Sequence, residues 1–278
     1  MSLLRTFNPL TSSVNDSLQG RSYTSIYTLG QRFNFPASDV LHDICEFSIQ
    51  RPNGAPDNYR LYTPSTNTYG IEVVSSDAQD TLTGEGVQRI RVRYLDSNWE
   101  LQSVDVDMNG TTPVTVVASG VRRVNDFFSI QTGITSVAEG DIMLQTTTGS
   151  SIEAPWTGQQ TLGMLTQGGN KDMTAVFTVP ENKEVYITEI NVSSANSDQS
   201  VRVSANVDPI SRELVAYNCF LFQSVDLIGS NSNASQGLSF LKFPSRADIK
   251  ISASPTATGA DTSCHVVMAM LDKVTVIP

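Results

Sequence analysis

The residues that most often carry out chemistry in proteins are scarce in this sequence. Only two histidines, three cysteines and two tryptophans occur among 278 residues. The sequence has no HExxH, GxSxG, P-loop or GxGxxG motif that would present metal ligands or an activated nucleophile. Cys264 and His265 are neighbours in a predicted strand, where adjacent side chains point to opposite faces. We therefore predict that the protein is not an enzyme and has no catalytic residues, no cofactor and no metal.

A pair of carboxylates of the glycosidase type is the enzymatic alternative that the sequence leaves open. The chain has 28 Asp and Glu residues, and any two of them could meet in the fold. Sugar clefts are usually lined with aromatic side chains, however, and Trp99 and Trp156 are the only tryptophans. Trp99 begins a predicted strand, so we interpret it as a packing residue.

The cysteines and the apolar segments exclude further classes of protein. Cys45, Cys219 and Cys264 show no CxxC spacing, which argues against a disulfide framework or a zinc site. We expect buried free thiols in a chain made in a reducing cytoplasm, although a Cys219–Cys264 bridge stays open. No apolar run approaches the ~18 residues that span a bilayer, and the start MSLLRTFNPLTSS lacks the apolar core of a signal peptide. We expect no membrane partner.

Charged residues are also few, and most are acidic. They make up 17% of the chain, with 18 Lys and Arg against 28 Asp and Glu, which gives a formal net charge of −10. Nucleic-acid binding needs clustered basic residues, and the sequence has no basic block. We predict no nucleic-acid partner and interpret the acidity as a source of solubility.

Alternation of apolar and polar residues with a period of two is the pattern that the sequence does have. In GVQRIRVRYLD, Ile90, Val92 and Tyr94 fall on one face and three arginines on the other. WELQSVDVDM alternates in the same way, and similar runs separated by turn signals continue to the end of the chain, as in MTAVFTVPENKEVYITEINVSS, SVRVSANVDP, ADIKISAS and CHVVMAMLDKV. Residues from 69 to about 147 read as a β-meander of hairpins. No alternation of strands and helices is visible.

The predicted fold class is all-β, with two antiparallel β-sandwich or jelly-roll domains preceded by an irregular N-terminal arm. Residues 1–60 are polar and lack a steady period, so they form an arm or a packed extended segment. The first sandwich covers residues 61–148, a Gly-, Ser- and Pro-containing linker covers 149–160, and a jelly-roll-like sandwich covers 161–278.

Within residues 1–60, the stretch SDVLHDICEF (38–47) favours one short helix. Ser38 is a good N-cap residue, and Val40, Leu41, Ile44 and Cys45 would share one helical face. The competing prediction is a strand from Ile44 to Ile49.

The hexapeptide DVDMNG (105–110) has two interpretations. The acidic residues at alternate positions followed by Gly110 look like the start of a calcium loop, but the twelfth position is Val116 where a bidentate Glu is needed. The flanks alternate as strands do, so the prediction is a strand that ends in a type I′ turn at Asn109-Gly110. If the polar faces of neighbouring strands coincide, Arg89 and Arg91 lie opposite Asp107 and Asp105.

Residues 71–145 resemble a β-module found in virion proteins of tailed bacteriophages. The resemblance lies in a series of turn and strand signatures, which are Asp80-Thr81, Gly84 and Gly86, Leu95-Asp96, Asn109-Gly110 and Gly140-Asp141-Ile142. The segments FTVPENKEVYITEINVSS and FPSRADIKISAS are similar to β-sandwich modules of phage particles. Together they cover roughly two-thirds of the chain and leave out residues 1–60.

This resemblance implies a structural component of a bacteriophage particle, made in the host cytoplasm and located in the virion. A capsid decoration or cement protein is the expected role, and similarity to trimeric sandwiches implies a homo-oligomer, as a trimer. The expected partners are other virion proteins, such as the major capsid protein. The alternative is a tail or fibre protein that binds a host surface glycan through the loop GSNSNASQG (229–237), which also reads as a flexible connector.

Apolar and aromatic residues in the N-terminal segment are the candidate partner-binding site. Scattered on a polar segment, such side chains can anchor in the pockets of a partner. Alternatively, they cover the protein's own first sandwich. The candidate residues are Phe7, Leu10, Tyr23, Tyr27, Phe33 and Phe35.

Overall fold

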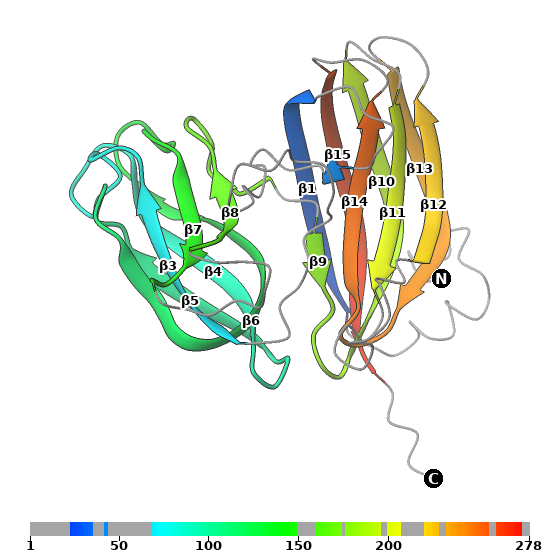
Figure 1. Cartoon of the computed structure of the whole chain (residues 1–278), viewed down its shortest axis with the longest axis horizontal. Coiled ribbons are helices and arrows are strands. Elements are labelled where there is room, and N and C mark those ends of the chain that lie inside the picture. Colours follow the sequence, from blue (N-terminus) through cyan, green and yellow to red (C-terminus); the bar gives the residue numbers. More distant parts are fainter. Residues whose placement is uncertain are drawn as a thin grey trace, which may run out of the picture.

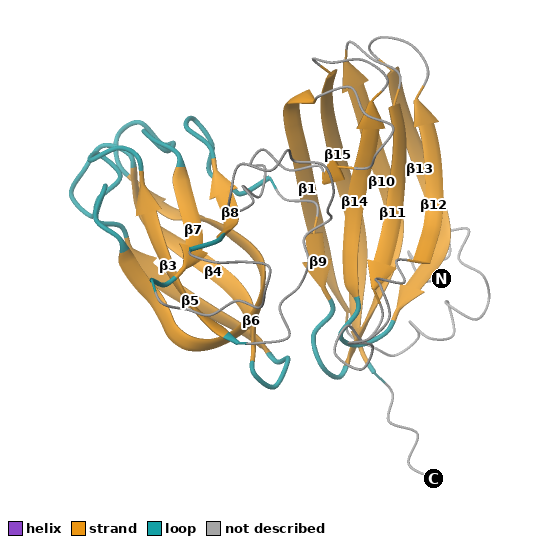
Figure 2. Cartoon of the chain, in the orientation of Figure 1, coloured by secondary structure: helices purple, strands orange, loops and turns teal. Residues whose placement is uncertain are grey.

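All regular elements in the described part of the chain are β-strands (Figure 1). The computed structural model describes residues 23–35, 42–43, 68–148, 159–173, 176–195, 199–206, 220–227, 232–255 and 260–273. Within these residues Figure 2 shows only strands and their connecting loops, and every strand pair is antiparallel. The prediction of an all-β fold with antiparallel sheets is confirmed.

The strands form three sheets. A six-stranded sheet has the order β5-β4-β6-β3-β7-β8, and its strands are β3 (Tyr69–Ser75), β4 (Val87–Asp96), β5 (Leu101–Asp107), β6 (Val114–Thr132), β7 (Ile142–Thr146) and β8 (Thr161–Leu165). The order β1-β15-β10-β13 joins β1 (Tyr23–Phe35), β15 (Ala260–Asp272), β10 (Lys183–Ala195) and β13 (Ser232–Phe243). The order β12-β11-β14-β2 joins β12 (Phe220–Leu227), β11 (Gln199–Asn206), β14 (Asp248–Pro255) and β2 (His42–Asp43), and β9 (Val176–Thr178) also pairs with β14.

The six-stranded sheet curls around its own core. Strand β6 is 19 residues long, and its first part pairs with β3 while its second part pairs with β4. The segment after β8 returns to β6, where the Asp172 amide donates to the Phe127 carbonyl at 3.1 Å. The enclosed core consists of Tyr69, Ile71, Val73, Val87, Ile90, Val92, Met108, Val121, Phe127, Ala138, Ile142, Leu144 and Leu165. Every one of these residues belongs to this unit, which we call the curled unit.

The predicted meander of hairpins is wrong between β5 and β6. Strand β5 pairs with β4, and β6 lies on the other side of β4, so the two consecutive strands are not neighbours. Gly110 has a φ of +58°, but Asn109 does not share this left-handed conformation, as a type I′ turn requires. The Gly110 amide donates instead to the Asp80 carbonyl at 2.8 Å, and its carbonyl accepts from Ser75. Packing against the loop after β3 therefore replaces the hairpin turn.

The two smaller sheets form the layers of a second unit (Figure 1), which we call the two-layer unit. Its strands pair in nested order along the chain: β1 with β15, β9 with β14, β10 with β13 and β11 with β12. In β15 burial alternates from Ser263, which is exposed, to Val266, and it becomes continuous from Met268 to Leu271. The first strand of this unit thus lies beside its last.

The curled unit is inserted into one strand of the two-layer unit. Strand β2 pairs Asp43 with Ser252 of β14, and β9 pairs Val176 with Lys250 of the same strand. Only Ile251 separates the two partners, so Asp43 and Val176 lie roughly 7 Å apart, two steps along a strand. Strands β2 and β9 are therefore two pieces of one strand, and the strands of the curled unit lie between them in the sequence.

Strands β1 and β2 lie within residues 1–60, and β8 lies within the range predicted for the second sandwich. Tyr23–Phe35 is a strand that pairs with β15, within the residues that were predicted to form an arm or a packed extended segment. The helix predicted at 38–47 is wrong at His42 and Asp43, which pair with β14, because tertiary pairing overrides the local helical pattern. Strand β8 pairs with β7, so the sheet predicted to end at residue 148 extends past the expected linker to Leu165. Residues 149–158 and the strand expected at Ile44–Ile49 lie outside the described residues.

We expect a fragment of residues 68–173 to fold alone, because its core and all its strand pairs are internal. Urea unfolding followed by circular dichroism should give one cooperative transition. A matched fragment that ends at residue 148, as the sequence pattern suggested, lacks β8 and the core residue Leu165 and should be less stable. Equal stability of the two fragments, or an unfolded 68–173 fragment, would contradict this assignment.

The turn between β4 and β5 depends on the ionised side chain of Asp96. Its carboxylate accepts hydrogen bonds from the Asn98 and Glu100 amides and from Gln102 Nε2. Partial burial alone would raise the pKa of Asp96, but the three hydrogen bonds outweigh it and lower the pKa below its ordinary value. The stabilisation is therefore complete above the unfolded-state pKa of about 3.9 and is lost as the pH falls through the lower folded-state value.

Asp96→Asn should consequently cost about 1 kcal/mol in the free energy of unfolding at pH 7, and less at an acidic pH, where the wild-type side chain also begins to lose its charge. Urea titrations at both pH values measure the difference. A cost that does not change with pH would mean that the charge is irrelevant to this turn.

Candidate interaction surfaces

The predicted partner-binding residues divide between the described strand β1 and the segment before it. Phe7 and Leu10 lie outside the described residues. Tyr23, Tyr27, Phe33 and Phe35 all belong to β1, where Tyr23 stands opposite Leu271 and Tyr27 opposite Val267. The backbone at these four positions is part of a sheet.

The polar stretch 229–237 is a strand for most of its length. Ser232–Gly237 forms the start of β13 and pairs with β10, for example Ser235 with Asn191. The loop predicted at these residues is therefore wrong, and residues 229–231 lie outside the described part. The Ser- and Asn-rich composition had suggested a turn, but cross-strand pairing determines the backbone here.

The arginine stripe of β4 is neutralised by aspartates, as predicted. Arg91 Nε and Nη2 donate to Asp105 at 2.6 and 2.8 Å, and Arg89 Nε donates to Asp107 at 2.6 Å. These hydrogen bonds raise the pKa of both guanidinium groups, and the hydrogen bond from Arg91 lowers the pKa of Asp105. The two carboxylates of DVDMNG thus pair with arginines of the neighbouring strand, as the strand interpretation predicted. Among the residues that the structure describes, no cluster of His, Cys, Asp and Glu could hold a metal ion.

Three of the motifs that carry the phage resemblance, at Asp80, Gly86 and Gly140, meet around one buried carboxylate. Asp80 is fully buried and accepts hydrogen bonds from Ser75 Oγ and from the Val87, Glu139 and Gly140 amides. A Cβ on Gly86 would lie 2.2 Å from Asp80 Oδ1, so only glycine fits there. Segments 75–87 and 139–141 are therefore joined by Asp80, a role that the sequence signatures did not reveal.

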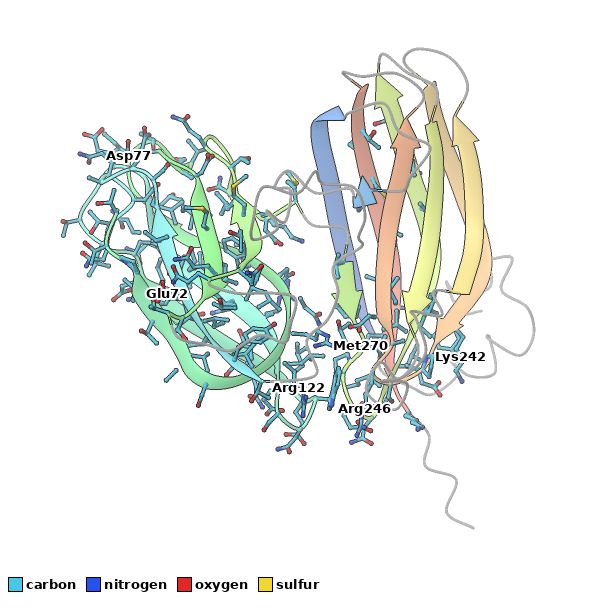
Figure 3. All side chains as sticks on the ribbon, viewed as in Figure 1. Glu72, Asp77, Arg122, Lys242, Arg246 and Met270 are labelled. Carbon is cyan, nitrogen blue, oxygen red and sulfur yellow. The ribbon has the colours of Figure 1, made fainter. Side chains whose placement is uncertain are left out.

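Trp99 lies at the junction of the two units. Its ring is buried, and the guanidinium carbons of Arg123, Arg122 and Arg246 lie 5.0, 5.6 and 5.8 Å from the ring centroid. Figure 3 shows Arg122 of the curled unit close to Arg246 of the two-layer unit. The Trp99 carbonyl also accepts a hydrogen bond from the Glu181 amide at 2.8 Å. Trp99 is thus a packing residue, as predicted, and its contacts join the two units.

The backbone at Trp99 indicates that this position is under constraint. Its φ is +65°, in the left-handed region that bulky residues rarely adopt. The conformation allows the Trp99 amide to donate to the Asp96 carbonyl while the ring faces the arginines. Burial, followed by the charges of Arg123 and Arg246, lowers the pKa of Arg122. The junction thus concentrates positive charge around one aromatic ring.

A buried ion pair crosses the same junction. Arg123 is 1% exposed and Asp248 is 0% exposed, and Arg123 Nε donates to Asp248 Oδ1 at 3.0 Å. Thr178 Oγ1 donates to the same oxygen at 2.6 Å. Asn125 adds an uncharged link. Its side-chain Nδ2 donates to the Thr178 backbone carbonyl, and its Oδ1 accepts from the Thr178 backbone amide. Strands β6, β9 and β14 are therefore held together by buried polar groups that hydrogen-bond to one another.

Cys264 is a buried free thiol, as predicted, so the Cys219–Cys264 bridge is absent. Burial raises the pKa of Cys264 to about 12, which keeps the thiol protonated and unreactive at neutral pH. His265 follows it on the opposite face of β15 and is partly exposed, which agrees with the expectation that the two side chains do not form a pair. Cys45, Cys219 and Trp156 lie outside the described residues.

Comparisons with known proteins give no family for this chain. No protein-family model matches it, and no curated protein matches. Among solved structures, the Gt strain of infectious bursal disease virus matches with 10% identity and a TM-score of 0.18, covering 93% of this chain and 78% of that one. The VP2 subviral particle of infectious bursal disease virus matches with 11% identity and a TM-score of 0.17, covering 98% and 81%. TM-scores this low do not establish a shared fold. A search of the described residues for a helix long and apolar enough to cross a membrane finds none.

Removing either partner of the buried ion pair should be strongly destabilising. Arg123→Met leaves the carboxylate of Asp248 buried without a counter-ion, and we expect a loss of about 3–5 kcal/mol in the free energy of unfolding. Arg123→Met combined with Asp248→Asn should lose clearly less than the sum of the two single variants.

The matched control is Arg91→Met, which breaks an exposed pair whose side chains are 43% and 39% exposed and should cost less than about 1 kcal/mol. Urea unfolding of the four variants measures these losses. Strict additivity of the two single losses would contradict direct coupling between Arg123 and Asp248.

Proposed function

We propose that this chain is a structural, non-enzymatic protein of a virus particle. In this proposal it is a capsid decoration or cement protein that self-associates, as a trimer, through its two-layer unit. It docks on other virion proteins, such as the major capsid protein, and needs no nucleic acid, membrane or cofactor.

The nested strand pairing of the two-layer unit is the observation that carries the proposal. The unit has eight strands if β2 and β9 count as one. The first strand pairs with the last, the second with the second-to-last, and so on to the central pair β11 and β12. This order is typical of a jelly roll, an architecture used in viral capsid domains and also in lectins. Fold alone does not fix function, so the proposal also needs the sequence resemblance to virion modules.

The structural use of the resemblance motifs supports a scaffold role. Asp80, Gly84, Gly86 and Gly140 serve to fasten loops, since a Cβ on Gly84 or Gly140 would meet backbone atoms at 2.1 and 2.6 Å. Carboxylates that an enzyme could use are likewise engaged in holding the fold, as with Asp80 and Asp248. These roles favour a protein that positions other molecules.

The pairing of the surface arginines supports the absence of a nucleic-acid partner. Arg89, Arg91 and Arg93 each bind an aspartate at 2.6 Å. A phosphate backbone would have to displace these carboxylates before it could release counterions. The paired stripe is a solvated sheet surface.

A glycan-binding tail or fibre protein remains the second candidate, because lectins also use jelly rolls. The loop predicted at 229–237 suggested this function, but Ser232–Gly237 belongs to strand β13 and gives it less support. Phe7 and Leu10 remain candidates for a partner-binding segment in either function.

Purified particles of the virus should contain the chain in fixed stoichiometry, measured by mass spectrometry and by antibody labelling in electron micrographs. Light scattering at micromolar concentration should give about three times the 30.2 kDa of one chain. The 68–173 fragment, which lacks the two-layer unit, should stay monomeric and is the control. A monomeric full chain that neither occurs in particles nor binds to particles lacking it would overturn the proposal.

A further inference from the structure

The end of the curled unit that lies away from the junction carries exposed apolar side chains. Among the residues whose side-chain burial the structure describes, four large apolar side chains are exposed, and three of them lie at this end: Leu82, Ile130 and Ile134. Ile134 is 82% exposed and Leu82 is 43% exposed. Figure 2 shows the loops of this end gathered away from the two-layer unit, and Asp77 marks it in Figure 3. We call the loops 76–86 and 133–141 the loop tip.

Leu82 and Ile134 belong to two loops that contact each other. The Gly133 amide donates to the Gly86 carbonyl at 2.7 Å, and the Thr135 amide donates to the Glu85 carbonyl at 3.1 Å. A Cβ on Gly133 would lie 2.4 Å from the Gly84 carbonyl oxygen, which shows how closely the loops pack. Single exposed apolar residues are ordinary on protein surfaces, but here two loops in backbone contact each present one.

Ile134 is held in place although its side chain is in water. Thr135 Oγ1 donates to the Glu85 carbonyl at 2.8 Å, and Asn170 Nδ2 donates to the Ser136 carbonyl at 2.8 Å. Ser136 has a φ of +62°, a left-handed conformation that closes the turn back to Gly133. Residues on both sides of Ile134 are therefore fixed before any partner arrives, which reduces the entropy lost on binding.

The charge of the loop tip indicates the chemistry of its partner. Asp77, Glu85, Glu139 and Asp141 lie in these loops, and neither loop contains Lys or Arg. Within the described residues no salt bridge joins these four side chains to a base. A second copy of the loop tip would be repelled by the same charges, whereas a basic partner would be attracted and oriented.

We propose that the loop tip is a docking surface for a basic segment of a partner protein, in which an apolar side chain packs on Ile134 and Leu82 while Lys or Arg side chains meet the surrounding carboxylates. This inference deepens the proposed function, since it names the surface with which a particle protein would dock. It uses the curled unit, whereas self-association uses the two-layer unit.

Selection from a random library of displayed 12-residue peptides tests the proposal on the full chain without a known partner. Enriched peptides should combine an apolar residue with Lys or Arg. Their affinity should fall about tenfold or more for the Leu82→Ser/Ile134→Ser variant and several-fold for Glu85→Gln/Glu139→Gln. Both changes are at the surface, and circular dichroism checks that the variants fold.

Leu101→Ser is the matched control, because Leu101 is 39% exposed but lies on β5, beside the turn that carries Trp99. It should leave peptide affinity unchanged. Enrichment of peptides without basic residues, of peptides that bind the double variant equally well, or of none at all would overturn the loop-tip proposal. Absence of the chain from virus particles would instead contradict the proposed function and leave the peptide result as it stands.

Discussion

The buried pair of Arg123 and Asp248 is the interaction on which the arrangement of the two units depends. It joins a strand of the curled unit to a strand of the two-layer unit, 125 residues apart in sequence, with both charges removed from water. Charges in such a place are tolerated only when their remaining hydrogen-bonding positions are filled. Thr178 and the Arg122 carbonyl fill some of these positions, and the Trp99 ring covers Arg123. A misplaced junction would leave charges unpaired, so the pair selects one relative orientation.

In the curled unit, the sequence predicted those strands whose alternation of apolar and polar residues shows which face is buried. Alternation in residues 86–108 correctly gave strands β4 and β5, the inward Val92 and Met108, and the pairing of Arg91 with Asp105. These features follow from a period of two and the opposite charges of neighbouring strands. Local pattern is sufficient for them.

Features that depend on distant segments could not be predicted in the same way. Nothing local in Arg122-Arg123 distinguishes the buried residue from its neighbour, because the partner Asp248 belongs to another unit. The nested pairing of β1 with β15, the division of one strand into β2 and β9, and the position of β6 beside β4 are also long-range. The loop tip is intermediate: its motifs were visible as signatures, but the rigidity of Ile134 follows from loops brought together by Asp80 and its glycines.

The insertion within a single strand has a consequence for synthesis on the ribosome. The curled unit leaves the exit tunnel whole, with every strand that it needs, while β1 and β2 have emerged earlier and still lack their partners. Those partners, β15 and β14, follow every other described strand in the chain, so the two-layer unit cannot complete its sheets until residue 272 has emerged. During this interval the nascent chain carries one folded module together with strands whose edges are unpaired, and such edges can associate with other chains.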